Sequence, residues 1–171
     1  MTKLLFEDLI ETHYTTTEAA VKEYSIFKTD FQDVLGYDET TGGSIALQKG
    51  HQPRALYDEL PTALILKNVG YSVILLDESG IGKQVDCLVD GVLSEIKLVK
   101  TFSHRSLKDD FYEAHKKGAK RLILTISTDT SRETVTIVLK RIANNPFVNK
   151  INDIFLILDN KLERLTLSDF K

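Results

Sequence analysis

The sequence predicts an α/β fold in which a central mixed sheet is flanked by helices. Apolar runs of strand length alternate with segments of helical periodicity along most of the 171 residues, which is the pattern of a sheet covered by helices. Two pairs of turn residues, Asp90-Gly91 and Asp159-Asn160, each separate two such runs, as in a β-hairpin. With 42% hydrophobic residues, the chain has enough apolar side chains for one sizeable core.

An N-terminal helical layer is expected before the sheet. The first 35 residues have helical spacing, and Thr15 to Thr17 are candidate N-caps. The stretch GYDETTGG then interrupts the pattern with turn residues. We therefore expect a single domain over residues 1–171, with a helical layer at 1–40 and the core at 42–171.

The core elements follow in order. A short strand is expected in SIALQKG, then a helix in RALYDELPTALILKNVG that ends at Gly70, and a strand in YSVILLDE that ends at the turn SGIG. The hairpin KQVDCLVDGVLSEIKLVK comes next. A helix in HRSLKDDFYEAHKKG ends at Gly118, RLILTIS is a buried strand, SRETVTIVLKRIANN is a helix that ends before Pro146, and KINDIFLILDNKLERLTL is a final strand or hairpin.

Membrane, exported and disulfide-rich classes are disfavoured. No run approaches the roughly 18 consecutive apolar residues of a membrane span, and the start MTKLLFEDLIETHY carries acidic residues where a signal peptide needs an apolar centre. Cys87 is the one cysteine, which excludes an intramolecular disulfide and a multi-cysteine zinc site. We expect a chain that is cytoplasmic as given and has no membrane partner.

Charge is distributed unevenly along a chain whose formal net charge is −3. Residues 1–40 hold nine acidic and three basic residues, whereas residues 97–121 hold eight basic and three acidic residues. The second segment is therefore suited to a phosphate backbone although the whole chain is acidic. Four side chains on its predicted helix are candidates for phosphate contact: Arg105, Lys108, Lys116 and Lys117.

Three charged residues stand within the predicted hairpin. Alternation places Asp86 on one face of the first strand, and Glu95 and Lys97 together on one face of the second. The two-residue turn can bring Asp86 to the same side beside Glu95. Two carboxylates held close together repel each other, so the arrangement requires a counter-charge. A divalent cation would provide it, with Lys97 as a further positive charge.

A Mg²⁺ (or Mn²⁺) ion on Asp86 and Glu95 is suited to the hydrolysis of phosphodiester bonds. Carboxylate oxygens hold the metal, and its open positions take water and the scissile phosphate. Lys97 would orient the attacking water or neutralise charge that grows on the phosphate. Gln84, two residues before Asp86, is a further candidate for substrate contact, and His51 is a further candidate for contact or for acid–base chemistry near neutral pH.

The order of Asp86 followed across a turn by Glu95-Ile96-Lys97 resembles the core of the PD-(D/E)xK nuclease superfamily, which includes restriction endonucleases. Val85 stands where the proline of that name would be. The stretches GGSIALQKGH, NVGYSVILL, GKQVD and DGVLSEIK resemble more narrowly the tRNA-cleaving C-terminal toxin domains of contact-dependent growth inhibition proteins and related mobile-element nucleases. This resemblance covers roughly residues 42–127 and extends to the final strand region.

The resemblance implies a restriction-endonuclease-like fold and a metal-dependent endonuclease. It implies that Glu59, on the helix before the first core strand, is a further catalytic residue that binds the metal directly or through water. It favours RNA, especially tRNA, over DNA as the nucleic-acid substrate. It also implies a toxin, with delivery into target cells and a cognate immunity protein as partner.

Other interpretations stay open. Asp86 can be a solvated edge-strand residue, and Glu95 with Lys97 an ordinary surface ion pair. Glu59 can serve the helix dipole, with Asp58 as N-cap and Pro61 in the first turn. His51 can be a surface residue, and the basic helix a solvated face. For the whole chain, the alternatives are a DNA endonuclease of the same fold, a catalytically inactive nucleic-acid-binding or interaction module, and an immunity or scaffold protein.

Overall fold

The structure is a computed structural model. It describes residues 34–38, 40–48, 51, 55–78, 82, 84–126 and 129–171. Most of the predicted helical layer at 1–40 lies outside these residues. The chain divides into two compact units, the first reaching Gly82 and including Asp86–Gly91, and the second formed by Lys83–Val85 and Val92–Lys171.

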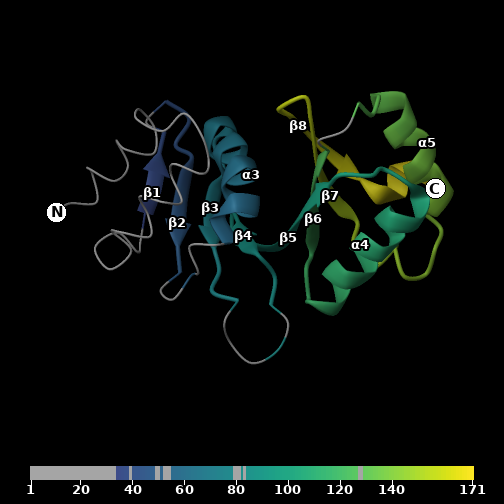
Figure 1. The fold of residues 1–171 in the computed structure, drawn as a ribbon, viewed down its shortest axis with the longest axis horizontal. Helices are drawn as coiled ribbons and strands as arrows, with labels where there is room; N and C mark the ends of the chain where they lie inside the picture. Colours follow the sequence, from purple (N-terminus) through teal and green to yellow (C-terminus); the bar gives the residue numbers. More distant parts are fainter. Residues whose placement is uncertain are drawn as a thin grey trace. The chain divides into compact units, whose positions relative to one another are not determined.

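The first unit is a mixed sheet with one helix (Figure 1). Its elements are β1 (Val34–Tyr37), β2 (Ser44–Leu47), α3 (Leu56–Val69), β3 (Ser72–Leu75) and β4 (Cys87–Val89). Strands β1 and β2 are antiparallel, β2 and β3 are parallel, and β3 and β4 are antiparallel. Helix α3 makes the crossover that two parallel neighbours require, and it packs on β2 and β3.

Strand β1 corrects the sequence prediction, which continued a helix through Leu35. Tyr37 instead pairs with Ser44 of β2. The carboxylate of Asp38 accepts hydrogen bonds from the backbone N–H groups of Thr40 and Thr41 at 2.9 and 3.1 Å. A local turn of this kind competes with helix formation, and it returns the chain antiparallel to β1.

Helix α3 begins within the predicted segment. Its N-cap is Ala55, which rules out the alternative with Asp58 as N-cap, and Pro61 lies inside the helix and not in its first turn. Glu59 stays in the first turn. The helix ends at Gly70 as predicted, with φ at 114°, and the Gly70 N–H donates to the carbonyls of Leu66 and Lys67. A left-handed glycine is the usual helix terminator.

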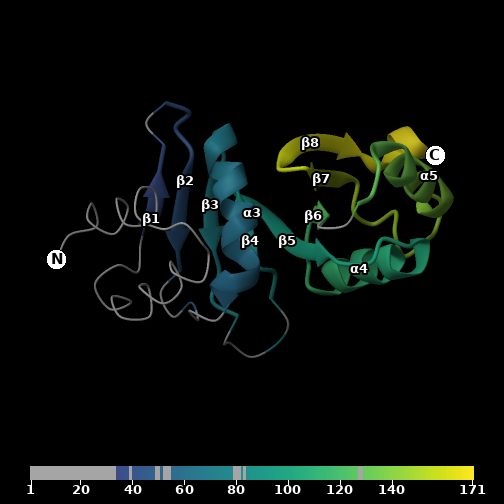
Figure 2. The same cartoon turned by 45° about the horizontal axis from the view of Figure 1, so that its top comes forward.

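The second unit has two consecutive crossovers followed by a hairpin (Figure 2). Its elements are β5 (Val92–Val99), α4 (His104–Lys116), β6 (Arg121–Ile126), α5 (Arg132–Ile142), β7 (Asp153–Leu158), β8 (Lys161–Thr166) and the 3₁₀ helix η3 (Leu167–Phe170). Strands β5, β6 and β7 are parallel in that order, and β8 is antiparallel to β7.

Helix α4 is fixed at both ends by its own sequence. Ser103 and Ser106 form a reciprocal capping box at the start, which satisfies N–H groups that the helix cannot pair internally. Gly118, with φ at 87°, follows the helix as predicted. The side chains of Leu107, Phe111 and Ala114 are buried at helical spacing, and this face holds the helix in the unit.

Both predicted hairpin turns are present. Asp90 and Gly91 have φ values of 47° and 79°, and Asp159 and Asn160 have φ values of 50° and 59°, as a two-residue turn of type I′ requires. The predicted α/β class with mixed strand directions and flanking helices is confirmed. Among the described residues, no helix is both long and apolar enough to span a bilayer.

Candidate functional site

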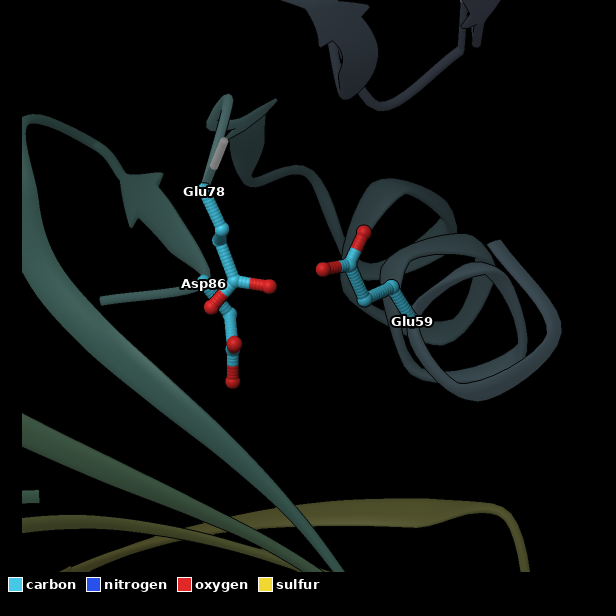
Figure 3. A group of neighbouring side chains, drawn as sticks. All are labelled: Glu59, Glu78 and Asp86. Atoms are coloured by element: carbon cyan, nitrogen blue, oxygen red, sulfur yellow. The ribbon is translucent and has the colours of Figure 1, made fainter. Parts of the chain in front are cut away.

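Three carboxylates of the first unit converge. Glu59, Glu78 and Asp86 each offer one oxygen, and these oxygens lie within 4.8 Å of one another. Figure 3 shows Glu59 reaching from helix α3 toward the other two side chains. Glu78 follows the end of β3, and Asp86 stands at a bend one residue before β4. Two antiparallel neighbours and the helix before them therefore place the three groups together.

Asp86 lies outside the strand in which it was predicted. Strand β4 begins at Cys87, and the backbone carbonyl of Asp86 accepts a hydrogen bond from Leu76 N–H at 2.8 Å. The Asp86 residue is 9% exposed. This burial rules out the interpretation of Asp86 as a solvated edge-strand residue.

His51 holds Glu59 from the loop before helix α3. Its Nε2 lies 2.7 Å from Oε2 of Glu59, and both residues are buried. A carboxylate only accepts hydrogen bonds, so Nε2–H donates when Glu59 is ionised. The bond fixes the Glu59 carboxylate through its Oε2. His51 is therefore not the surface residue that the sequence left open.

The three-carboxylate group has the electrostatics of a site that requires a cation. Burial raises the pKa of Glu59, the hydrogen bond and charge of His51 offset part of that effect, and the charges of Glu78 and Asp58 raise the pKa further. Close like charges and desolvation both disfavour the ionised form. A divalent cation would reverse this balance by favouring all three carboxylates.

The donor set fits a hard divalent cation. All three ligand atoms are carboxylate oxygens, which Mg²⁺, Mn²⁺ and Ca²⁺ prefer. Opposite ligands of Mg²⁺ are about 4.2 Å apart, and those of Ca²⁺ about 4.8 Å. A separation within 4.8 Å therefore matches the span of one coordination sphere, with a small contraction or one bridging water for Mg²⁺.

Glu95 and Lys97 form a second charged centre, in the second unit. They lie on the same side of β5, as the alternation predicted, with Lys97 Nζ 3.6 Å from Oε1 of Glu95. Lys117, just after helix α4, donates to the same Oε1 at 2.6 Å. Two ammonium groups thus converge on one carboxylate oxygen.

The other oxygen of Glu95 is the unusual one. Glu95 is 1% exposed, and its Oε2 is buried with no hydrogen-bond partner among the described residues. A buried carboxylate oxygen without a partner is costly, and it is found where a ligand, an ion or a water completes the site. The interpretation of Glu95 as half of an exposed surface ion pair is ruled out by this burial.

Lys97 is stabilised in its charged form. Burial favours the neutral amine, but the 2.9 Å hydrogen bond to Glu113 and the charges of Glu95 and Glu113 outweigh it and raise the pKa of Lys97. Beside it, burial raises the pKa of Asp110 to about 6, although the charge of Lys97 acts in the opposite direction. Lys97 therefore provides a fixed positive charge.

Helix α4 divides its charges between two faces. Asp110, Glu113 and Lys117 follow one another at intervals of three and four residues, which places them on one side of the helix. This side interacts with Lys97 and Glu95. Lys117 therefore belongs to the Glu95 centre, and its role in phosphate contact stays a prediction.

The opposite side of α4 carries the rest of the predicted basic set. Arg105 and Lys116 are exposed and Lys108 is half-buried, and spacing places all three on one side with Tyr112. The ammonium of Lys116 lies 5.1 Å from the centre of the Tyr112 ring. Three of the four predicted phosphate-contact residues therefore share an outward side of the helix.

Glu78 and Glu113 were missed by sequence reasoning. The sequence did carry signals: Glu78 follows a strongly apolar strand, and Glu113 lies on the side of α4 that carries Lys117. Gln84 is exposed and precedes β4, so its predicted strand position is wrong. Asp86 belongs to the first unit and Glu95 to the second, and the metal they were expected to share stays a prediction.

No family model matches the sequence, and no curated protein matches it. A solved structure does. One chain of the CdiA-CT/CdiI toxin and immunity complex from Burkholderia pseudomallei is similar, with a TM-score of 0.54 and 18% sequence identity. The match covers 70% of this chain and 98% of that chain. At this identity the likeness concerns the fold alone.

Proposed function

We propose that the protein is a metal-dependent nuclease that hydrolyses phosphodiester bonds in RNA, in a toxin setting. The observation that carries this proposal is the convergence of Glu59, Glu78 and Asp86 within 4.8 Å. Three converging carboxylates, two of them buried and Glu78 exposed, repel one another in a purely structural role. A divalent cation bound between them would favour their ionised form and could activate a water molecule. The fold likeness to a chain of a toxin and immunity complex supports the setting.

Each residue has a part in this mechanism. Glu59, Glu78 and Asp86 would hold Mg²⁺ or Mn²⁺, and His51 would keep the Glu59 carboxylate in place. The bound cation would supply a more acidic water and neutralise charge on the phosphate. The resemblance gives Glu95 and Lys97 catalytic parts in the same reaction, Glu95 as a ligand and Lys97 as the group that orients the attacking water.

The proposed partners follow from the same resemblance. We propose tRNA as the favoured substrate, with DNA as the second candidate, and a cognate immunity protein as inhibitor. The neighbouring solved structure is itself a complex of a toxin with its immunity protein. A catalytically inactive nucleic-acid-binding module of the same fold is the competing class, and it differs by lacking metal-dependent cleavage.

The purified protein should be incubated with total tRNA, other RNA and plasmid DNA, each with Mg²⁺ and each with excess EDTA. The proposal expects tRNA to be cut in Mg²⁺ and to remain intact in EDTA. Asp86→Asn and Glu59→Gln should each lose most of the cleavage, because each removes a charged metal ligand. Cleavage of plasmid DNA alone would favour the DNA endonuclease. Binding of RNA without any cleavage would favour the inactive module.

A further inference from the structure

A surface hollow on the second unit has the composition of a nucleobase site. It measures about 260 Å³ and is lined by Lys108, Asp109, Tyr112, Asn145 and Phe147. Tyr112 and Phe147 are 42% and 62% exposed, so they present ring surface to solvent rather than to the core. Their ring centres are 5.6 Å apart at an interplanar angle of 87°.

The two rings are held by local structure. Tyr112 projects from the middle of helix α4, whose opposite side is buried. Phe147 lies in the turn after helix α5, where the Asn145 Oδ1 accepts a hydrogen bond from Phe147 N–H at 2.9 Å. Pre-positioned aromatic rings bind with a smaller loss of conformational freedom than mobile ones.

The positive charge around the hollow favours an anionic ligand, and the two aromatic rings favour a ligand that carries a flat ring. Lys108 is part of the lining, and Lys116 lies over the Tyr112 ring. Arg105 is one turn before Lys108 and Asp109 on the same side of α4. Asp109 is the one acid of the lining among the described residues, while Asp110 and Glu113 interact with Lys97 on the other side of the helix.

We propose that this hollow binds one unpaired nucleobase of the substrate strand, with Lys108 and Lys116 contacting its flanking phosphates. Base–aromatic stacking accepts any base, and lysines follow the backbone. The Asn145 amide can donate to a base edge, and the Asp109 carboxylate can accept from an exocyclic amino group. This inference rests on the proposed function and adds to it that the substrate is read in a single-stranded region.

The size of the hollow agrees with this ligand. Sites for drug-sized ligands measure about 300–1,000 Å³, so a hollow of about 260 Å³ suits one ring system rather than a folded peptide segment. Two exposed aromatic rings at this distance offer stacking surface to a base.

The test measures binding without catalysis. Fluorescence anisotropy in EDTA would follow a labelled single-stranded RNA oligonucleotide, and an abasic oligonucleotide of the same length. Phe147→Ala and Tyr112→Ala should each weaken binding of the RNA about tenfold, with the salt slope unchanged. Neither should affect the abasic strand. Lys108→Ala should weaken both strands and lower the salt slope by about one.

Ile137→Ala is the matched control. Ile137 is 66% exposed in helix α5 of the same unit and does not line the hollow, so this variant should bind both strands as the wild type does. Undiminished RNA binding by Phe147→Ala and Tyr112→Ala would overturn the inference, as would an equal loss on the abasic strand. If the wild type cleaves RNA while these variants bind normally, only the base site fails. If the wild type binds through the hollow and never cleaves, only the proposed function fails.

Discussion

The ammonium of Lys117 lies 2.6 Å from Oε1 of Glu95, so a residue just after helix α4 neutralises a buried carboxylate of strand β5. Lys97 approaches the same oxygen at 3.6 Å. The pairing explains how a strand whose middle is buried on both faces tolerates a charge, since buried charges are stable only when paired. The second oxygen, Oε2, is buried without a hydrogen-bond partner among the described residues.

Replacing Lys117 by Met should destabilise the protein. Glu95 would keep Lys97 but lose its closest counter-charge. We expect the free energy of unfolding to fall by about 2 kcal/mol. This is less than the cost of about 3–5 kcal/mol for breaking a fully buried pair, because Lys117 is partly exposed. Urea unfolding would measure it. Lys116→Met is the control, because that residue is exposed and its ammonium lies 5.1 Å from the centre of the Tyr112 ring. If both variants unfold at the same urea concentration as the wild type, the Lys117–Glu95 pair does not stabilise the fold.

Gly43 should be intolerant of any side chain. A Cβ added there would lie 1.8 Å from the carbonyl oxygen of Lys67, at the end of helix α3. Gly43→Ala should therefore cost about 3 kcal/mol, seen as a lower thermal midpoint. The neighbouring Gly42 has φ at 77° and open space around it, so Gly42→Ala should cost only about 1 kcal/mol of backbone strain. Equal costs would contradict the close packing at Gly43.

Asp110→Asn should stabilise the protein at pH 8 and not at pH 4. Burial raises the pKa of Asp110 to about 6. A carboxyl whose folded pKa is raised favours folding below its unfolded pKa, near 4, and loses that contribution as pH rises through 6. Asparagine mimics the neutral form, so the difference between variant and wild type should grow from pH 4 to pH 7. A constant difference across that range would show that Asp110 does not titrate there.

Glu78 should contribute to metal affinity although it is exposed. Glu78→Gln removes one of the three charges that converge within 4.8 Å, and the loss of a ligand should weaken Mn²⁺ binding by about tenfold or more. Isothermal titration with Mn²⁺ would measure it. Asp58→Asn is the control, because Asp58 is an exposed acid next to Glu59 that does not belong to the group. Equal affinities for the two variants would mean that net charge alone attracts the ion.

Much of the fold follows from local signals in the sequence. Gly70 and Gly118 mark helix ends because they adopt positive φ, and both hairpin turns carry the residues that such turns require. Strand β1 was missed because Val34 and Leu35 also fit a helical repeat, and only the Asp38 turn and the pairing with β2 decide between the two. Propensity is a weak guide wherever tertiary pairing competes with it.

Two of the three converging carboxylates could be named from the sequence, and the third could not. Asp86 and Glu59 carry signals in their own segments, and the structure brings them together in the first unit. The signal of Glu78 was weak, because an acidic residue after an apolar strand is also an ordinary surface feature. The burial of Glu95 depends on α4 covering β5, which a strand pattern does not report. The spacing of the charged residues Asp110, Glu113 and Lys117 would have indicated which side of α4 faces Glu95.

The most direct measurement of the central claim is the rate of tRNA cleavage as a function of Mg²⁺ concentration, for the wild type, Asp86→Asn and Lys97→Ala, each first shown to be folded. We predict that wild-type cleavage rises with Mg²⁺ to a plateau and is absent in EDTA. Asp86→Asn should fail at every concentration, and Lys97→Ala should keep its Mg²⁺ dependence with a plateau at least a hundredfold lower. Wild-type cleavage that persists in excess EDTA, or an Asp86→Asn variant with the wild-type curve, would contradict the claim.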